Sequence, residues 1–437
     1  MKLKKLTALC LAGIMAIGIL AGCSKTEETK TENGQEKITI RLLTRMAGTS
    51  PQVGIYNDII DEFKAMYPEV EIVDDSKGDD DSFNNILKTD MASGTMANIF
   101  RIQGVANLSD YIDQGYLLDV TPYLKADDAW NHFTEGSVSY YEVPGKDGVY
   151  GVPCEAGLIG VYYNERIFTE AGIESFPETW SELLIAIEKI KEIDVTPIAM
   201  GAKTSYMAGH LHNNIFYKYM GTEAAKKLGN RELAWNDPDV VQSLQYVKDL
   251  NDMGAFSDGA AGLSDDVVKT DFQNGDAAMM ITGPWNITSF NNPETCPEAG
   301  NIKLAKFPYF DEKPEFKDED MQVISPYMIN GKLEGRELEL TMELVKMLTG
   351  KAAAERFANE TAQLIPRTDI EVDKTIVDPL FTQNVDFCAT STGVAVDVFD
   401  FDSVTSMQDR TRNSIVSMFT GASAQEAANE IQAEVDK

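Results

Sequence analysis

The sequence predicts an α/β protein built from two lobes. Strands and helices alternate along both halves of the chain, which is the pattern of βα units around mostly parallel sheets. The 437 residues exceed what one hydrophobic core usually accommodates, so two lobes are expected. A strand interrupted by Gly151 and Pro153 is unsuited to the middle of a ladder, and we expect it to cross from one lobe to the other.

The N-terminus has the pattern of an export signal. Three lysines precede an apolar run from Leu6 to Leu20, which is too short for a membrane-spanning helix and ends in small residues before Cys23. We expect residues 1–22 to be a lipoprotein signal peptide, Cys23 to carry the lipid, and residues 23–36 to form a flexible tether. The mature protein is then expected outside the cytoplasm, anchored to the cell membrane.

The first lobe is assigned to residues 37–150, with a return at about 308–338. Apolar residues at strand spacing and at helix spacing follow one another in this part of the chain. The predicted elements are a strand at 38–42, a helix carrying Ile55, Ile59 and Phe63, a strand at 70–73, a helix at 82–92 and a strand at 99–102.

The second lobe is assigned to residues 151–307 and about 339–437. A strand over 158–163 leads into a helix that begins near Asn164 and ends at Gly172. Two further helices begin with a capping box, in which a Ser or Thr is followed three residues later by Glu, and a third begins with a capping Asp before proline. These starts are Thr179 with Glu182, Ser423 with Glu426, and Asp237 with Pro238.

Several motifs in the second half resemble a known family. Residues 148–153 (Gly-Val-Tyr-Gly-Val-Pro), 161–164 (Val-Tyr-Tyr-Asn), 171–173 (Ala-Gly-Ile) and 177–183 (Pro-Glu-Thr-Trp-Ser-Glu-Leu) follow in order. Their order is similar to the hinge and second-lobe opening of family 1 extracellular solute-binding proteins of ABC importers, which mostly bind sugars. The resemblance continues through 282–285 (Thr-Gly-Pro-Trp) to the C-terminus.

This resemblance implies a two-lobe, periplasmic-binding-protein-like (type 2) fold with a hinge and a ligand cleft between the lobes. It also implies a substrate-binding subunit that closes over a carbohydrate, with an oligosaccharide favoured, and delivers it to the ABC permease and its ATPase. We expect a monomer that needs no cofactor and is not an enzyme. The formal net charge of −32 argues against a nucleic-acid partner, because nucleic acid requires a basic surface.

Trp285 is the leading candidate for contact with a sugar. It follows a Gly-Pro turn after a strand, and ligands of open α/β sheets bind at the carboxyl edge of the strands. An indole face packs on the C–H face of a pyranose, and family members use the Trp of this turn for stacking. The same edge rule selects five weaker candidates, each of which could instead be structural: Arg45, Gln103, Glu155, Tyr206 and His210.

Two other functions stay open at this stage. A secreted carbohydrate-active enzyme is unsupported by any motif, although the seventy acidic residues make carboxylate pairs uninformative. A ferric-iron carrier of the same superfold could use Tyr162 and Tyr163, but neighbouring residues of a strand face opposite ways. His210 and His212 face different ways on a helix, which disfavours a shared metal.

Overall fold

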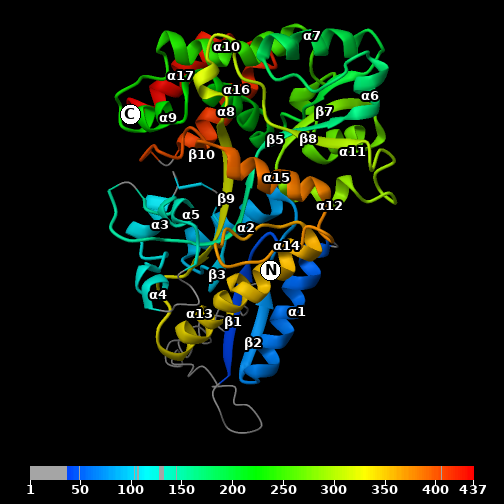
Figure 1. The fold of residues 1–437 in the computed structure, drawn as a ribbon. Coiled ribbons are helices and arrows are strands. Elements are labelled where there is room, and N and C mark those ends of the chain that lie inside the picture. The colour runs from blue at the N-terminus through cyan, green and yellow to red at the C-terminus, as the bar shows by residue number, and fades with distance from the viewer. Residues whose placement is uncertain are drawn as a thin grey trace, which may run out of the picture.

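The computed structural model describes residues 37–48, 50–102, 104–105, 108–126, 132–143, 145–404 and 406–437. The predicted signal peptide, the tether with Cys23, and Gln103 lie outside the described residues. Two sheets lie at opposite ends of the molecule, and strand β9 and the chain leading from β4 to β5 run between them (Figure 1). No helix in the described part of the chain is long and apolar enough to cross a membrane.

Within the described residues, the first sheet contains six strands. Its path is β10-β9-β3-β1-β2, and β4 pairs with β9 off this path. The strands β1, β2 and β3 are parallel, whereas β9 runs antiparallel to β3 and to β4. The bounds are β1 (Ile38–Leu43), β2 (Val70–Asp74), β3 (Ile99–Phe100), β4 (Val152–Leu158), β9 (Glu319–Ile329) and β10 (Gly393–Ala395).

The second sheet has four strands in the order β6-β7-β5-β8. Only β6 and β7 are parallel; β5 pairs antiparallel with both of its neighbours, so the expectation of mostly parallel sheets fails here. The physical reason is that β5 enters this lobe directly from the crossing strand β4 rather than through a helix. The bounds are β5 (Gly160–Asn164), β6 (Thr196–Ala199), β7 (Ala277–Thr282) and β8 (Ile302–Ala305).

Helices cover both sheets (Figure 1). Those of the first lobe are α1 (Pro51–Met66), α2 (Asp80–Ser93), α3 (Leu108–Asp113), α4 (Thr121–Ala126), α5 (Glu135–Ser139), α13 (Gly335–Thr349) and α14 (Lys351–Thr361). Those of the second are α6 (Glu165–Glu170), α7 (Trp180–Lys191), α8 (Tyr206–Met220), α9 (Glu223–Gly229), α10 (Pro238–Asp252), α11 (Asp265–Asn274), α12 (Ile287–Phe290), α15 (Pro379–Thr390), α16 (Met407–Met418) and α17 (Ala424–Val435). The predicted caps of α7, α10 and α17 are confirmed, with both capping boxes formed.

The two hydrophobic cores correct part of the lobe assignment. Residues from about 339 were assigned to the second lobe, but Leu344, Leu348 and Phe357 pack in the first core, where α13 and α14 lie against α1. Val152 and Cys154 of β4 also belong to the first core, so the second lobe opens at β5 rather than at residue 151. Apolar stripes identify buried helix faces but not the sheet that they cover, which is why the sequence misassigned these helices.

The crossing strands have distinct local features. β4 pairs with β9 alone among the named strands, and its register shifts between Pro153 and Glu155, as expected for a strand that contains proline. At the end of β4, the side-chain amide of Asn384 bonds the backbone N–H and C=O of Leu158. On β9, Met321 packs in the second core and Ile324 in the first. The strand that follows Gly151 and contains Pro153 therefore leads from the first lobe into the second, as predicted.

Candidate ligand-binding site

Three of the predicted residues meet on the second lobe and form what we call the aromatic corner: Tyr206, His210 and Trp285. Tyr206 and His210 lie one turn apart at the start of α8, with ring centroids 5.1 Å apart. The Trp285 ring lies 6.5 Å from that of Tyr206 and 6.2 Å from that of His210. Such separations suit edge and tilted aromatic contacts.

The turn after β7 fixes the direction of Trp285. Pro284 begins a short 3₁₀ turn over Pro284–Asn286, and the Asn286 amide donates a 3.0 Å bond to the Thr282 hydroxyl. A Cβ at Gly283 would lie 2.1 Å from the Trp285 ring, so only glycine permits the indole to fold over this position. Trp285 is partly exposed, unlike Trp235, which is buried in the second core. Trp285 therefore lies at the carboxyl edge of β7, as predicted.

Asp265 extends the corner and was not predicted. It is the first residue of α11, and its carboxylate accepts hydrogen bonds from the Tyr206 hydroxyl (2.9 Å) and the Thr204 hydroxyl (3.2 Å). The backbone N–H of Asp265 also donates to the Thr204 hydroxyl. These bonds hold a partly exposed carboxylate beside the phenol of Tyr206.

His210 joins the aromatic corner to a charged pair. Burial lowers the pKa of His210 to about 4, so its ring is neutral near pH 7, and its Nδ1 has no hydrogen-bond partner among the described residues. The charges that act on this ring are Asp397 and Arg412, which pair with each other at 3.2 Å. A Cβ at the neighbouring Gly209 would lie 3.4 Å from Cγ of Arg412, which shows how closely α8 and α16 approach here.

Asp400 connects this region to the first lobe. The hydroxyl of Tyr140, which follows α5, donates a 2.5 Å hydrogen bond to Oδ2 of Asp400. A Cβ at Gly104 would lie 2.5 Å from Oδ1 of the same carboxylate, and this glycine has a positive φ of 75°. Asp400 is 1% exposed, and burial together with the nearby charge of Asp397 raises its pKa to about 8.

Glu155 lies on β4 and pairs with an arginine that the sequence analysis overlooked. The Arg101 guanidinium contacts the Glu155 carboxylate at 3.2 Å and is 3% exposed, and its Nε has no hydrogen-bond partner in the described ranges. Gly157, two residues further along β4, faces the same way, and a Cβ there would lie 2.2 Å from Cγ of Pro284. This face of β4 is therefore directed at the turn that carries Trp285.

Arg45 does lie at the carboxyl edge of β1, as predicted. Its guanidinium donates to the backbone oxygen of Gly78 (3.0 Å) and lies 5.1 Å from the ring centre of Phe83. The same contacts would be present if Arg45 only stabilised the fold, so a ligand role for Arg45 stays a prediction. Gln103 lies outside the described residues, and its role likewise stays a prediction.

Sequence reasoning missed six residues of this region. Arg101 was assigned to the interior of a strand over 99–102, whereas β3 ends at Phe100 and leaves Arg101 at the edge. A prediction that ended this strand at Phe100 would have placed Arg101 at the sheet edge and made it a candidate. The others come from segments without a strand or turn signal that would mark an edge: Tyr140, Asp265, Asp397, Asp400 and Arg412.

The iron alternative gains no support from the tyrosine pair. Tyr162 is fully buried with its ring 5.1 Å from that of Phe290, whereas Tyr163 packs against Phe168 and Phe176. The two hydroxyls therefore do not converge, as the strand argument predicted. Within the described residues, no group of three His, Cys, Asp or Glu side chains could hold a metal ion.

The remaining histidine and the cysteines have structural surroundings. His212 faces away from His210, and its Nε2 lies 3.0 Å from the Ser243 hydroxyl on α10. Cys154, Cys296 and Cys388 are free thiols, the first two buried and the third partly exposed.

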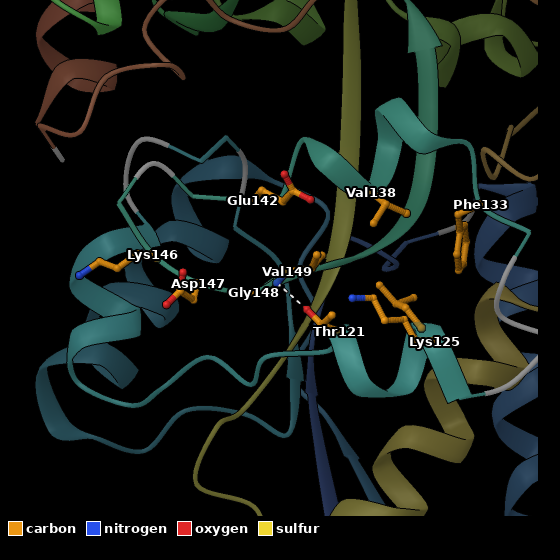
Figure 2. A pocket seen from close by; sticks show the side chains of 10 residues that line it. Thr121, Lys125, Phe133, Val138, Glu142, Lys146, Asp147, Gly148 and Val149 are labelled. Carbon is orange, nitrogen blue, oxygen red and sulfur yellow. Dashed lines mark hydrogen bonds between the residues drawn. The ribbon is translucent and has the colours of Figure 1, made fainter.

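Two cavities of the first lobe contain none of the predicted residues. One, of about 460 Å³, lies between α4 and residues 133–149. In Figure 2, Lys125 and Phe133 border one side and Lys146 and Asp147 the other, and the Val149 N–H donates a 3.0 Å bond to the Thr121 hydroxyl. The second, of about 760 Å³, lies beside α1, α13 and α14.

Comparison with known proteins gives three kinds of likeness. The model of the bacterial extracellular solute-binding protein family matches residues 47–355. A binding protein of Brucella abortus is 29% identical over 221 residues, 50% of each chain, so the match spans about half the length of this relative. The multiple sugar-binding protein of Streptococcus mutans is 24% identical over 310 residues, 68% of this chain and 69% of that protein.

The fold is shared with a solved structure named as a chitin oligosaccharide binding protein. The TM-score is 0.82 at 22% identity, over 92% of this chain and 98% of that one. This likeness confirms the predicted two-lobe, periplasmic-binding-protein-like fold. Because the family model covers well over half of the sequence, the chain belongs to the bacterial extracellular solute-binding protein family.

Proposed function

We propose that this protein is the substrate-binding subunit of an ABC importer and captures a carbohydrate, with an oligosaccharide favoured, by closing its lobes. The aromatic corner carries the proposal. Tyr206, His210 and Trp285 present ring faces and edges beside the carboxylate of Asp265, which is the combination that recognises a pyranose. The names of the Streptococcus relative and the chitin oligosaccharide binding protein agree with a sugar ligand.

In this proposal, the ring of Trp285 stacks on the sugar and the polar residues around it bind hydroxyl groups. His210 offers an unpaired Nδ1 from a neutral ring, and Arg101 and Arg412 each have an unpaired Nε in the described part of the chain. Ligand contacts to both lobes favour the arrangement in which Tyr140 and Asp400 touch. That arrangement is the one that docks on the permease and delivers the sugar.

We also propose that the protein is exported, anchored by lipid at Cys23, and acts as a monomer. Small residues before Cys23 and the apolar run before them support the anchor, and the family is extracellular by description. Labelling cells with a radioactive fatty acid tests the anchor, because the wild-type protein should be labelled and a Cys23→Ala variant should not. Light scattering of residues 37–437 tests the monomer.

A thermal-shift screen of residues 37–437 tests the function. The panel contains mono- and oligosaccharides, with amino acids, peptides and ferric iron as controls for the other ligand classes. A ligand that binds only the folded state adds about 2.7 kcal/mol of stability at a hundredfold excess over its Kd. A shift with sugars alone supports the proposal, whereas shifts only with peptides or iron would overturn the carbohydrate assignment. Chromatography of the sugar after incubation separates binding from hydrolysis, because a binding protein returns it intact.

A further inference from the structure

The charges around the aromatic corner constrain the chemical class of its ligand. Two arginines of this region already face a carboxylate: Arg412, which acts on His210, pairs with Asp397, and Arg101 of the first lobe pairs with Glu155, both at 3.2 Å. A cation that is already paired is a weak anchor for an anionic ligand, because the ligand must compete with the existing carboxylate.

Two more acidic side chains accept hydrogen bonds from neutral donors rather than from cations. Asp400 accepts from the phenol of Tyr140, and Asp265 accepts from the phenol of Tyr206 and the hydroxyl of Thr204. The described residues around the aromatic corner thus supply two arginines and the three carboxylates of Glu155, Asp397 and Asp265, whereas Asp400 holds a proton near pH 7 because its pKa is raised to about 8. Histidine does not restore the balance, because burial keeps His210 neutral near pH 7.

Burial makes this excess of acid costly for a further negative charge. Asp400 is 1% exposed, Asp397 9% and Arg101 3%, so water screens the interactions weakly. The pKa of Asp400, raised to about 8 by burial and by Asp397, reports the same unfavourable field. A ligand carboxylate or phosphate would meet the same desolvation and repulsion.

We propose that the ligand of this site carries no negative charge, so that neutral and amino sugars are accepted whereas uronates and sugar phosphates are rejected. This inference rests on the proposed carbohydrate function and narrows it to a substrate class. It assigns selectivity to the acidic residues Glu155, Asp265 and Asp397, whereas the aromatic corner provides affinity for sugars in general.

The test compares matched ligands that differ in one charge. Neutral trisaccharides of glucose, galactose and N-acetylglucosamine are titrated calorimetrically into residues 37–437 at pH 7, together with their counterparts oxidised to the carboxylate at C6. We expect each uronate to bind at least about tenfold more weakly than its neutral counterpart. A uronate that binds as tightly as its neutral counterpart overturns the inference and leaves the carbohydrate function standing; binding of neither kind overturns both.

Variants assign the selectivity to particular carboxylates. In the wild-type protein, the side-chain amide of Asn213 donates a 2.6 Å hydrogen bond to the Asp397 carboxylate. Asp397→Asn keeps an acceptor for this bond but leaves Arg412 without its anionic partner. We expect the ratio of neutral to uronate affinity to fall severalfold. Glu155→Gln likewise leaves Arg101 without its anionic partner, and it provides the test if Asp397→Asn does not fold. The matched control is Glu298→Gln, which removes the carboxylate facing Arg166 on α6. An unchanged ratio in both site variants, or an equal change in the control, contradicts the assignment.

Discussion

The hydroxyl of Tyr140 donates a 2.5 Å hydrogen bond to Asp400, and this bond joins the two lobes. Tyr140 packs against the first core, whereas the segment of Asp400 is fastened to α8 of the second lobe. The Tyr217 hydroxyl donates to the backbone oxygen of Val396, and Asn213 donates to Asp397. We expect this contact to be lost when the lobes separate, which makes it a probe of closure.

Tyr140→Phe should weaken ligand binding without unfolding the protein. The variant loses one hydrogen bond to a buried carboxyl group, about 1 kcal/mol or fivefold in affinity, and keeps the ring. Calorimetry with the sugar found in the screen measures the loss. Tyr150→Phe is the control, because the Tyr150 hydroxyl bonds the backbone oxygen of Asp147 within the same lobe. Equal losses in both variants would show that Tyr140 has no special role in closure.

Trp285→Ala should reduce sugar affinity by about thirtyfold, the equivalent of about 2 kcal/mol for a lost stacking face. Trp285→Phe should recover part of the loss because a ring remains. Trp180 provides the control, since it stacks on Phe310 within the second core and is 7% exposed. Trp180→Phe should lower stability while leaving affinity unchanged. A folded Trp285→Ala variant with wild-type affinity would remove this residue from the site.

Asp400 should make the protein less stable as the pH rises. Its pKa is raised from 3.8 to about 8 by burial, so between these values the folded state holds a proton that the unfolded state has released. Stability from this group is therefore complete below pH 3.8, falls as the pH rises, and reaches its lower limit near pH 8. Urea unfolding between pH 6.5 and 9 measures this slope.

The Asp400→Asn variant isolates this pH effect, since it keeps an acceptor for Tyr140 but cannot titrate. Its stability should vary less than that of the wild type between pH 6.5 and 9. His210 and His212 act in the opposite sense at lower pH, because burial lowers their pKa values to about 4 and about 3. The unfolded state then binds more protons below pH 6.5, so stability falls with acid. Identical slopes for wild type and variant at alkaline pH would rule out Asp400 as the source.

Gly157→Ala should destabilise the protein and weaken ligand binding. A Cβ at this position would lie 2.2 Å from Cγ of Pro284, so β4 and the turn that carries Trp285 must move apart. Overpacking of this kind costs about 1–3 kcal/mol. Gly54→Ala is the control, because nothing lies within 4 Å of its Cβ and it is inside α1. That change should stabilise the helix by about 0.5–1 kcal/mol. Chemical denaturation measures the free energy of unfolding, which should fall for Gly157→Ala and rise for Gly54→Ala.

Lys218→Met should cost about 1.5–3 kcal/mol, because it removes one charged hydrogen bond to the buried Asp320 carboxylate, which Lys306 still contacts at 2.8 Å. Lys218 is 0% exposed and lies 2.7 Å from Asp320 on the crossing strand β9. The pair holds this strand to α8, so the hinge should loosen as well. Lys226→Met removes an exposed pair with Glu223 and should change stability by less than about 0.5 kcal/mol. A loss of similar size in both variants would exclude a special role for the buried pair.

Local patterns in the sequence determined several elements and the starts of three helices. The capping boxes at Thr179 and Ser423 use side chains three residues apart, and the Gly-Pro-Trp turn uses three consecutive residues, so short-range geometry settles them. The same reasoning located Trp285 at a strand edge and brought Tyr206 and His210 to the start of one helix. The crossing strand with Gly151 and Pro153 followed from the hydrogen bond that proline cannot make.

Tertiary structure decided which distant segments meet. The sequence alone did not assign α13 and α14 to the first core, because an apolar helix face fits either sheet. Nor did it bring Tyr140 to Asp400, Arg101 to Glu155 or Arg412 to His210, since these contacts join segments from different parts of the chain. Sequence patterns record periodicity over a few residues, whereas burial and charge pairing depend on the packing of whole elements. The sequence therefore determined the fold class and the aromatic part of the candidate site, and only the packed structure determined the charges around it.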